Sequence, residues 1–241
     1  MDDWNLMTYD HGLFLQALSR FTRTLLSPYD VDVVLGELAE NLTDVLGLTG
    51  SGVALATEGS LQTVTAIPPH LVDLEQVQQD TQAGPCVEAV QTGTVIAVAD
   101  LRQEPADRWP AYHATAGRLG LIAVAGIPLR LNNQTLGALN MYDDHPRDWS
   151  PADIEAASVM ADMATGYLIN ASKLYQQQQV NQQLQSALDS RAIIEQAKGV
   201  IATAHGISVN DAFERIRRHA RNHNARVQDA AAAIVNLGMR I

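Results

Sequence analysis

The stretch from Ala152 to His205 contains no proline and only two glycines. The residues before it favour a helix N-terminus: Ser150 suits the cap position, Pro151 the first helical position, and Asp153 the first turn. One helix is therefore predicted from Ser150 to about residue 204. A helix of this length is typical of a coiled coil rather than of one globular domain.

Within this stretch, large apolar or amide side chains recur at alternating steps of three and four residues. The positions are Met160, Met163, Tyr167, Asn170, Leu174, Gln177, Asn181, Leu184 and Leu188. Such spacing predicts the contact seam of a coiled coil between two copies of the chain, with apolar contacts from Met160, Met163, Tyr167, Leu174, Leu184 and Leu188. A flexible glutamine-rich linker over residues 176–185 is the alternative. The coiled coil is favoured because the spacing continues through the glutamines.

The charge of the chain is unevenly distributed. The formal net charge of the whole sequence is −11, yet residues 190–241 hold eight basic and four acidic side chains, so this segment carries +4 and residues 1–189 carry −15. A small basic block attached to an acidic body predicts that the block alone binds a polyanion. The acidic body would repel the same partner.

Composition narrows the class of protein further. Apolar residues make up 46% of the chain but aromatic residues only 5%, which predicts an aliphatic core. The single cysteine excludes an internal disulfide and a cysteine-based zinc cluster, which favours a reducing, cytoplasmic location. The N-terminus is acidic, and no apolar run approaches the roughly 20 residues of a membrane span, so no export signal or membrane anchor is expected.

Before residue 150, segments with a helical period alternate with segments that have a strand period. Helical spacing is present over residues 13–46, where it stops at Gly47, and over residues 74–91, with a break at Gly84-Pro85. Strands are predicted at 53–56 and 61–67 around the turn Glu58-Gly59-Ser60, at 95–98, and at 121–131 and 135–142 around Asn132-Asn133. This order predicts a mixed α+β domain.

After Leu188 the apolar face of the long helix changes, which predicts a new core. A second helix is expected to start at the Ser208-x-x-Asp211 capping sequence, and a third to begin at Asn224 and to end at Gly238. The inward residues are Ile194, Ala197, Ile201, Ala212, Phe213, Ile216, Ala220, Val227, Ala231, Ile234 and Val235. Such a small, alanine-rich core is marginal alone, so support from dimer contacts is expected.

The basic block, from about Asp189 to Val235, resembles the ANTAR domain, an RNA-binding antitermination module. The matching stretches are Arg191 with Ile194–Ile201, Asp211–Glu214, Arg217–Arg221, Asn224 and Val227–Ala231. Ile216 stands where leucine commonly precedes arginine, a change that conserves volume. The resemblance implies binding to paired RNA stem-loops with hexanucleotide loops, which prevents a terminator from forming.

Residues from about 13 to 171 resemble a GAF domain of the type found before ANTAR domains. The matching stretches are Gly84–Val90, Asp107–Pro110, Ile127–Leu129 and Leu136–Asn140. This resemblance implies a six-stranded antiparallel sheet flanked by helices, with a small-molecule pocket on one face.

Binding to RNA loops requires cations for the phosphates, together with polar groups or close backbone for unstacked bases. The residues assigned to this task are Arg191, Gln196, Ala197, Lys198, Gly199, Arg217, Arg218, Arg221, Asn224 and Arg226. For Gly199, close approach of RNA and close packing of helices are both open interpretations. An ordinary solvated face would explain each arginine singly, but the charge reversal and the ANTAR resemblance favour RNA.

The chemistry of the GAF region is less defined. Cys86 has two interpretations: a redox or chromophore site, and a buried structural cysteine. The structural cysteine is favoured, because Val87 follows Cys86 where bilin-binding GAF domains have histidine. Trp149 and Asp153 match only the end of the cyclic-nucleotide signature, and His113 is a lone candidate for a haem or metal ligand. No catalytic set, phosphate loop or metal cluster is found, so no enzyme activity, metal or cofactor is predicted and the GAF ligand stays unassigned.

These observations predict a GAF sensor domain over residues 1–165, a coiled-coil linker over 166–188 and an ANTAR domain over 189–241. The expected protein is a cytoplasmic homodimer that binds RNA hairpins as an antiterminator under GAF-dependent control. The alternatives are a DNA-binding regulator with three helices, and a small-molecule, redox or light sensor centred on the GAF domain. Neither the GAF signal nor the target transcripts can be read from the sequence, nor whether dimerisation is constitutive.

Overall fold

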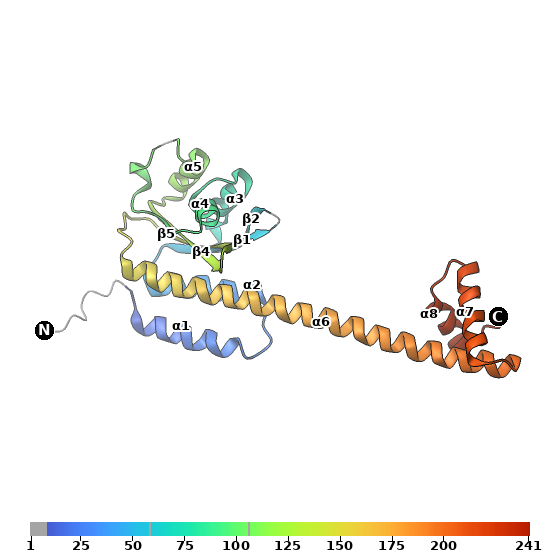
Figure 1. The fold of residues 1–241 in the computed structure, drawn as a ribbon. Helices are drawn as coiled ribbons and strands as arrows, with labels where there is room; N and C mark the ends of the chain where they lie inside the picture. The colour runs from blue at the N-terminus through green and yellow to red at the C-terminus, as the bar shows by residue number, and fades with distance from the viewer. Residues whose placement is uncertain (1–8, 58, 106) are drawn as a thin grey trace. The chain divides into compact units, whose positions relative to one another are not determined.

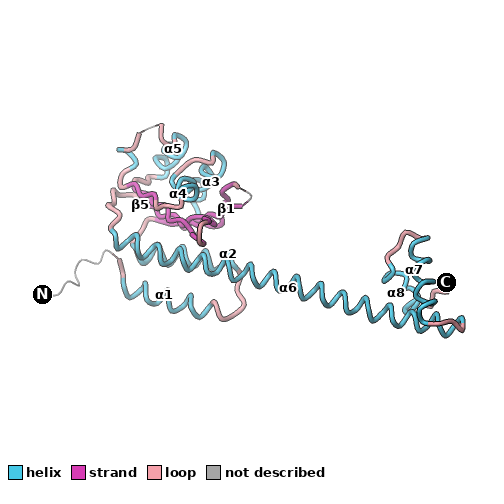
Figure 2. The backbone as a smooth tube through the Cα atoms, viewed as in Figure 1, coloured by secondary structure: helices cyan, strands magenta, loops and turns pink. Residues whose placement is uncertain are grey.

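The computed structural model describes residues 9–57, 59–105 and 107–241, so Glu58 of the predicted turn and most of the acidic N-terminus lie outside it. Two compact units divide the chain, Met1–Ala171 and Ser172–Ile241. Figure 2 shows the strands in the first unit, whereas the second is built from helices. The three predicted domain ranges stay predictions. No helix in the described ranges is long and apolar enough to cross a membrane.

The first unit contains a five-stranded antiparallel sheet with the strand order β2-β1-β5-β4-β3. The strands are β1 (Gly50–Thr57), β2 (Ser60–Ile67), β3 (Ile96–Val98), β4 (Ala123–Leu131) and β5 (Gln134–Asp143). The asparagine pair between β4 and β5 forms the predicted hairpin turn, with Asn132 at a φ of 53°. The GAF resemblance implied six strands, whereas the sheet of the described residues has five, with β2 and β3 at its edges.

Helices cover both faces of this sheet (Figure 1). One face packs against α2 (Val31–Leu46) and the first part of α6 (Pro151–His205), and α1 (His11–Thr24) packs against α2 on the side away from the sheet. The other face lies under α3 (Val72–Thr81), α4 (Pro85–Thr92) and α5 (Pro110–Leu119), with 3-10 turns at Pro69–Leu71 and Leu101–Gln103. Alternation along β5 separates the two sides: Leu139 and Met141 enter the core with α2 and α6, whereas Asn140 and Tyr142 point toward α3.

The predicted helical stretch 13–46 is in fact two helices, α1 and α2. Pro28 lies between them, where its missing N–H and fixed φ oppose a continuous helix. The carboxylate of Asp30 then accepts hydrogen bonds from the N–H groups of Asp32 and Val33 and caps α2. At the other end, Gly47 adopts the left-handed conformation, as the sequence predicted.

The second unit packs the end of α6 against α7 (Val209–Asn222) and α8 (Val227–Leu237). As predicted, Ser208 caps α7 by accepting a hydrogen bond from the N–H of Asp211. The buried core residues of the second unit are Ala197, Ile201, Ala212, Ile216, Ala220, Ala230, Ala231 and Ile234. The predicted start of the third helix at Asn224 is wrong, because its φ of 49° is left-handed and places it in the loop before α8.

The long helix α6 is confirmed, but part of the predicted seam is not available to a second chain. Met160 and Tyr167 have no exposed surface, because both pack into the core of the first unit with α1 and α2. Met163 is partly buried against the same core. By contrast, Leu174, Leu184 and Leu188 are 44, 59 and 61% exposed. Of the predicted seam, only the part from Leu174 onward can therefore contact a partner.

Candidate nucleic-acid interface

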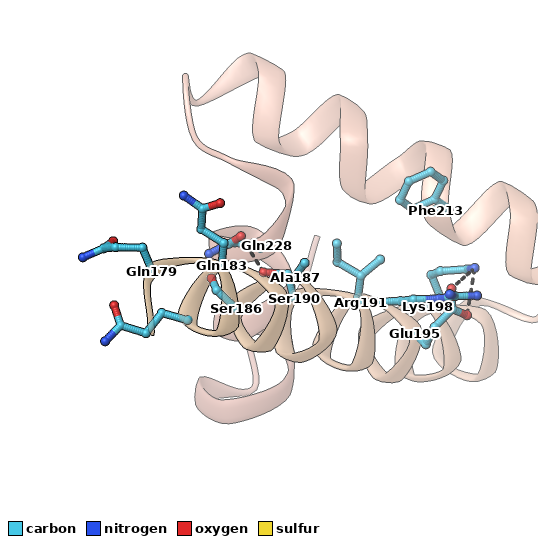
Figure 3. Close-up of a pocket in the computed structure, with 12 residues that line it drawn as sticks. Gln179, Gln183, Ser186, Ala187, Ser190, Arg191, Glu195, Lys198, Phe213 and Gln228 are labelled. Atoms are coloured by element: carbon cyan, nitrogen blue, oxygen red, sulfur yellow. Dashed lines mark hydrogen bonds and ion pairs between the residues drawn. The ribbon is translucent and has the colours of Figure 1, made fainter. Parts of the chain in front are cut away.

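An open groove of about 790 Å³ lies between the second half of α6 and helices α7 and α8 (Figure 3). Most of its wall comes from α6, with one residue each from α7 and α8. The lining residues are Gln179, Gln182, Gln183, Ser186, Ala187, Ser190, Arg191, Ile194, Glu195, Lys198, Phe213 and Gln228. We call this cavity the basic groove, because two of the predicted RNA-binding cations, Arg191 and Lys198, line it.

The ring of Phe213 lies between two cations at one end of the basic groove. The Nζ atom of Lys198 is 5.5 Å from the ring centroid, and the guanidinium carbon of Arg217 is 5.8 Å from it. Both cations are also paired with acids on their own helices, Lys198 with Glu195 and Arg217 with Glu214, each at 2.8 Å. Glu195 and Glu214 are more than half exposed, so water screens both ion pairs, although the side chain of Lys198 itself is only 15% exposed. An anionic ligand can compete for both cations.

Three other predicted cations, Arg191, Arg218 and Arg221, are exposed and have no acidic group within 4.0 Å in the described ranges. Arg226 pairs with Asp229 at 3.1 Å in an exposed i,i+3 pair. Helical spacing places Arg217 and Arg221 on one line along α7, with Phe213 one turn earlier. The structure thus presents a row of cations beside an aromatic ring, which suits phosphates flanking an unstacked base.

The local packing bears on two of the predicted RNA-binding residues, Ala197 and Gly199. The assignment of Ala197 to the RNA-binding surface is wrong, because its side chain is fully buried in the three-helix core. Gly199 lies two residues further, about 200° around the helix, on the opposite, exposed face. A Cβ atom at Gly199 would meet no described atom within 4 Å, so close helix packing within one chain does not explain this glycine. Gln196 and Asn224 are exposed.

The first unit holds a buried polar cluster that the sequence analysis missed. Its centre is Glu75 on α3, which has no exposed surface. The side-chain amide of Asn140 donates to both carboxylate oxygens, at 2.8 and 3.0 Å, and the hydroxyl of Tyr142 donates to Oε1. Gln78 donates a weaker hydrogen bond at 3.4 Å. Burial raises the pKa of Glu75 to about 7, although these three hydrogen bonds act in the opposite direction.

The chain makes room for this cluster at a glycine. A Cβ atom on Gly52 would lie 2.1 Å from the carboxylate of Glu75, so no other residue fits opposite this side chain. A sequence signal did exist: Leu71, Leu74, Glu75 and Gln78 follow the spacing of one buried helix face. The face was not recognised as buried, because Glu75 and Gln78 are polar residues.

The first unit contains further buried polar atoms on a cysteine, a tyrosine and a histidine. Cys86 is fully buried, as favoured from the sequence, and burial raises the pKa of its thiol well above the ordinary value. The backbone N–H of Cys86 donates to Gln78 at 2.9 Å. The hydroxyl of Tyr112 and Nε2 of His113 are buried without a hydrogen-bond partner among the described atoms.

The two residues that matched the end of a cyclic-nucleotide signature have structural surroundings. The indole N–H of Trp149 donates to the carbonyl of Val98 at 3.1 Å. Asp153 is buried in the first turn of α6, where its backbone N–H donates to Ser150. Both residues thus fasten the start of α6 to the first unit.

Comparisons with known proteins agree with the two resemblances. The GAF domain model matches residues 30–168, and the ANTAR domain model matches residues 182–235. No curated protein sequence matches this chain. Both family models describe regulatory, non-catalytic domains.

Solved structures share the fold of the first unit. The GAF domain of an Acinetobacter phosphoenolpyruvate-protein phosphotransferase is 13% identical with a TM-score of 0.51, covering 68% of this chain and 97% of that one. The free methionine-R-sulfoxide reductase of Neisseria meningitidis is 17% identical with a TM-score of 0.52, covering 68% and 92%. The GAF domain of a Coxiella burnetii phosphoenolpyruvate-protein phosphotransferase is 15% identical with a TM-score of 0.52, covering 67% and 95%. At these identities the likeness concerns the fold alone.

Proposed function

Because the chain belongs to the GAF domain family and ends in an ANTAR domain, we propose that it is an antiterminator that binds paired stem-loops in nascent transcripts under the control of its GAF domain. The coarser part of this function, an RNA-binding antitermination regulator with a sensory input, follows from the two domains. The recognition of paired hairpins and the GAF-dependent control are the steps that we add.

The observation that carries the proposal is the convergence of cations on an aromatic ring in the ANTAR unit. Lys198 and Arg217 lie on the ring of Phe213 at one end of the basic groove, Arg191 lines the same groove, and Arg221 continues the row along α7. Duplex contacts require cations alone, whereas unstacked loop bases also require a surface on which a π-face can rest. The combination favours a hairpin over a uniform duplex.

The dimeric part of the proposal rests on the exposed segment of α6. Every residue from 172 to 189 is exposed, including the seam residues Leu174, Leu184 and Leu188. An isolated helix with exposed leucines gains stability when those leucines are buried against a second helix. Two ANTAR units on one dimer would bind two linked stem-loops with a raised effective concentration. A GAF signal that shifts the dimer population would then change RNA binding.

Binding of hairpin RNA and duplex DNA at matched salt tests this function. Lys198→Ala and Arg221→Ala should each weaken hairpin binding and lower the slope of log affinity against log salt by about 1, as expected for a lost phosphate contact. Arg215→Ala is the matched control: Arg215 is on the same helix as Arg221, but its Nε donates to the carbonyl of Ile241 at 3.1 Å, outside the predicted site.

Arg215→Ala should therefore bind hairpins more tightly than either of the other two variants. Preference of the wild-type chain for duplex DNA would favour the DNA-binding alternative and overturn the proposal. Equal affinity of all three variants and the wild type would refute the assignment of the interface.

A further inference from the structure

The basic groove contains side chains that no part of the RNA-binding assignment includes. Its end away from Phe213 is lined by Gln179, Gln182, Gln183 and Ser186, which lie in the predicted linker 166–188. Gln179 precedes the ANTAR match, and the other three are among its first residues. We propose that these linker side chains are part of the RNA-binding surface and that their amides read the edges of unpaired loop bases. This inference rests on the proposed RNA-binding function and extends its site from the assigned residues to the first residues of the ANTAR match and to Gln179 before it.

The glutamines lie on the side of α6 that faces away from the predicted seam. Gln179 is two residues from each of the seam positions Gln177 and Asn181, and therefore about 200° around the helix from each. Ser186 has the same relation to Leu184 and Leu188. A coiled coil through the seam would leave this outer face and the groove open. A dimer would then offer two such grooves, one on each chain.

Charge distinguishes the basic groove from its neighbour. A second cavity of about 540 Å³ shares Gln182, Ser186, Ser190 and Gln228 with it, but its remaining lining includes Asp189 and Asp229. The hydroxyl of Ser190 donates to Oε1 of Gln228 at 2.7 Å, and both residues line both cavities. A polyanion is attracted to the side that carries Arg191 and Lys198 and is repelled from the acidic side. RNA held by these cations would lie against Gln179 and Gln183.

The chemistry of the glutamine amide suits this position. Each amide offers two N–H donors and a carbonyl acceptor, so it can pair with the Watson–Crick or Hoogsteen edge of an unpaired base. Because the amide is neutral, it contributes to sequence preference and not to the counterion release that phosphate contacts produce. Substitution of the linker glutamines is therefore expected to change the preference for loop sequence, and substitution of the ANTAR cations to change the salt dependence of binding.

The experiment uses the full chain and a pool of RNA hairpins with a fixed stem and a randomised loop of about six nucleotides. Bound RNA is sequenced to give the enrichment of each loop, and total affinity is measured at several salt concentrations. The test variant is Gln179→Ala with Gln183→Ala. The matched control is Gln176→Ala with Gln178→Ala, which removes two exposed amides from the same helix outside the groove.

The test variant should reduce the enrichment of the preferred loops by about tenfold or more, since one well-formed amide–base contact discriminates by that order. Its salt slope, helix content and oligomeric state should equal those of the wild type and the control. Unchanged loop enrichment in the test variant, with clear enrichment by the wild type, would overturn this inference and leave the proposed function standing. Absence of hairpin binding by the wild type would instead remove the function on which the inference rests.

Discussion

Glu75 is a buried acid whose neighbours are all neutral. Its carboxylate receives hydrogen bonds from Asn140, Tyr142 and Gln78, and Cys86 and Tyr112 also lie close enough to interact electrostatically. No ion pair to Glu75 is found among the described residues. Its pKa of about 7 is therefore set by desolvation, and the charged form is the costly one in the folded state.

This cost predicts that the first unit loses stability as the pH rises. The pKa of Glu75 increases from 4.5 to about 7 on folding, so the unfolded chain releases the proton first. The free energy of unfolding should fall between about pH 4.5 and 7 and then level off, by roughly 3 kcal/mol in all. Glu75→Gln removes this charge, so its unfolding free energy should exceed that of the wild type at pH 8 but not at pH 4.

Chemical denaturation of the full chain at several pH values measures this difference. Glu40→Gln serves as the control, because Glu40 is an exposed acid on α2. A pH dependence in Glu75→Gln as steep as that of the wild type would contradict the assignment. So would an equal effect of both substitutions.

Single residues were predictable from the sequence where one local rule decided their position. Gly47 and Ser208 were assigned correctly because helix ends have strong residue preferences. Ala197 was misassigned, because a family motif contains core and surface residues alike and only the helical phase separates them. Glu75 was missed because its partners Asn140 and Tyr142 follow more than sixty residues later and meet it only in the folded sheet.

At the scale of elements, the period of the apolar residues identified most helices and strands. It failed between α1 and α2, where the helical spacing continues across a break made by Pro28. It also could not show which partner a helix face would meet. The same three-four spacing along α6 serves the core of the first unit at Met160 and Tyr167 and faces solvent from Leu174 onward. Burial inside a domain and burial between chains therefore have the same sequence signature.

The two glycines inside α6 provide a test of the RNA-facing side of this helix. At both Gly166 and Gly199, the place that a Cβ atom would occupy has no described atom within 4 Å, so alanine fits at either position. Each substitution should stabilise the helix by up to about 1 kcal/mol. Only Gly199→Ala should also weaken hairpin binding, because a methyl group there would hold the RNA away from the backbone.

Thermal unfolding and hairpin affinity, measured on both variants, separate the two effects. Gly166→Ala is the control, since Gly166 lies in the part of α6 that belongs to the first unit. Unchanged RNA affinity in Gly199→Ala would show that this face of α6 does not meet RNA, although the gain in stability would remain.

At the scale of the whole molecule, charge divided the chain much as packing does. The reversal from acidic to basic begins near residue 190, and the structure separates its two units between Ala171 and Ser172. The difference is residues 172–189, which the charge count placed with the acidic body and the packing places with the second unit. Composition could not assign this segment, because the roles that we propose for its exposed leucines and glutamines require a second chain and an RNA.

The double substitution Leu184→Asn with Leu188→Asn should separate the two chains and thereby weaken binding to twin hairpins. Both leucines are about 60% exposed and are predicted seam residues, so their burial would drive pairing of the linkers. Tyr175→Asn is the control, since Tyr175 is 63% exposed but lies outside the seam spacing. Sedimentation equilibrium would report the dimer, and affinities for one hairpin and for two linked hairpins would report its consequence.

In the wild type, the linked RNA should bind much more tightly than the single hairpin, because the second contact is intramolecular. The double asparagine variant should be monomeric and should lose this difference while keeping its affinity for one hairpin. If that variant stays dimeric, or becomes monomeric with the advantage of linked RNA intact, the coiled coil does not couple the two RNA sites.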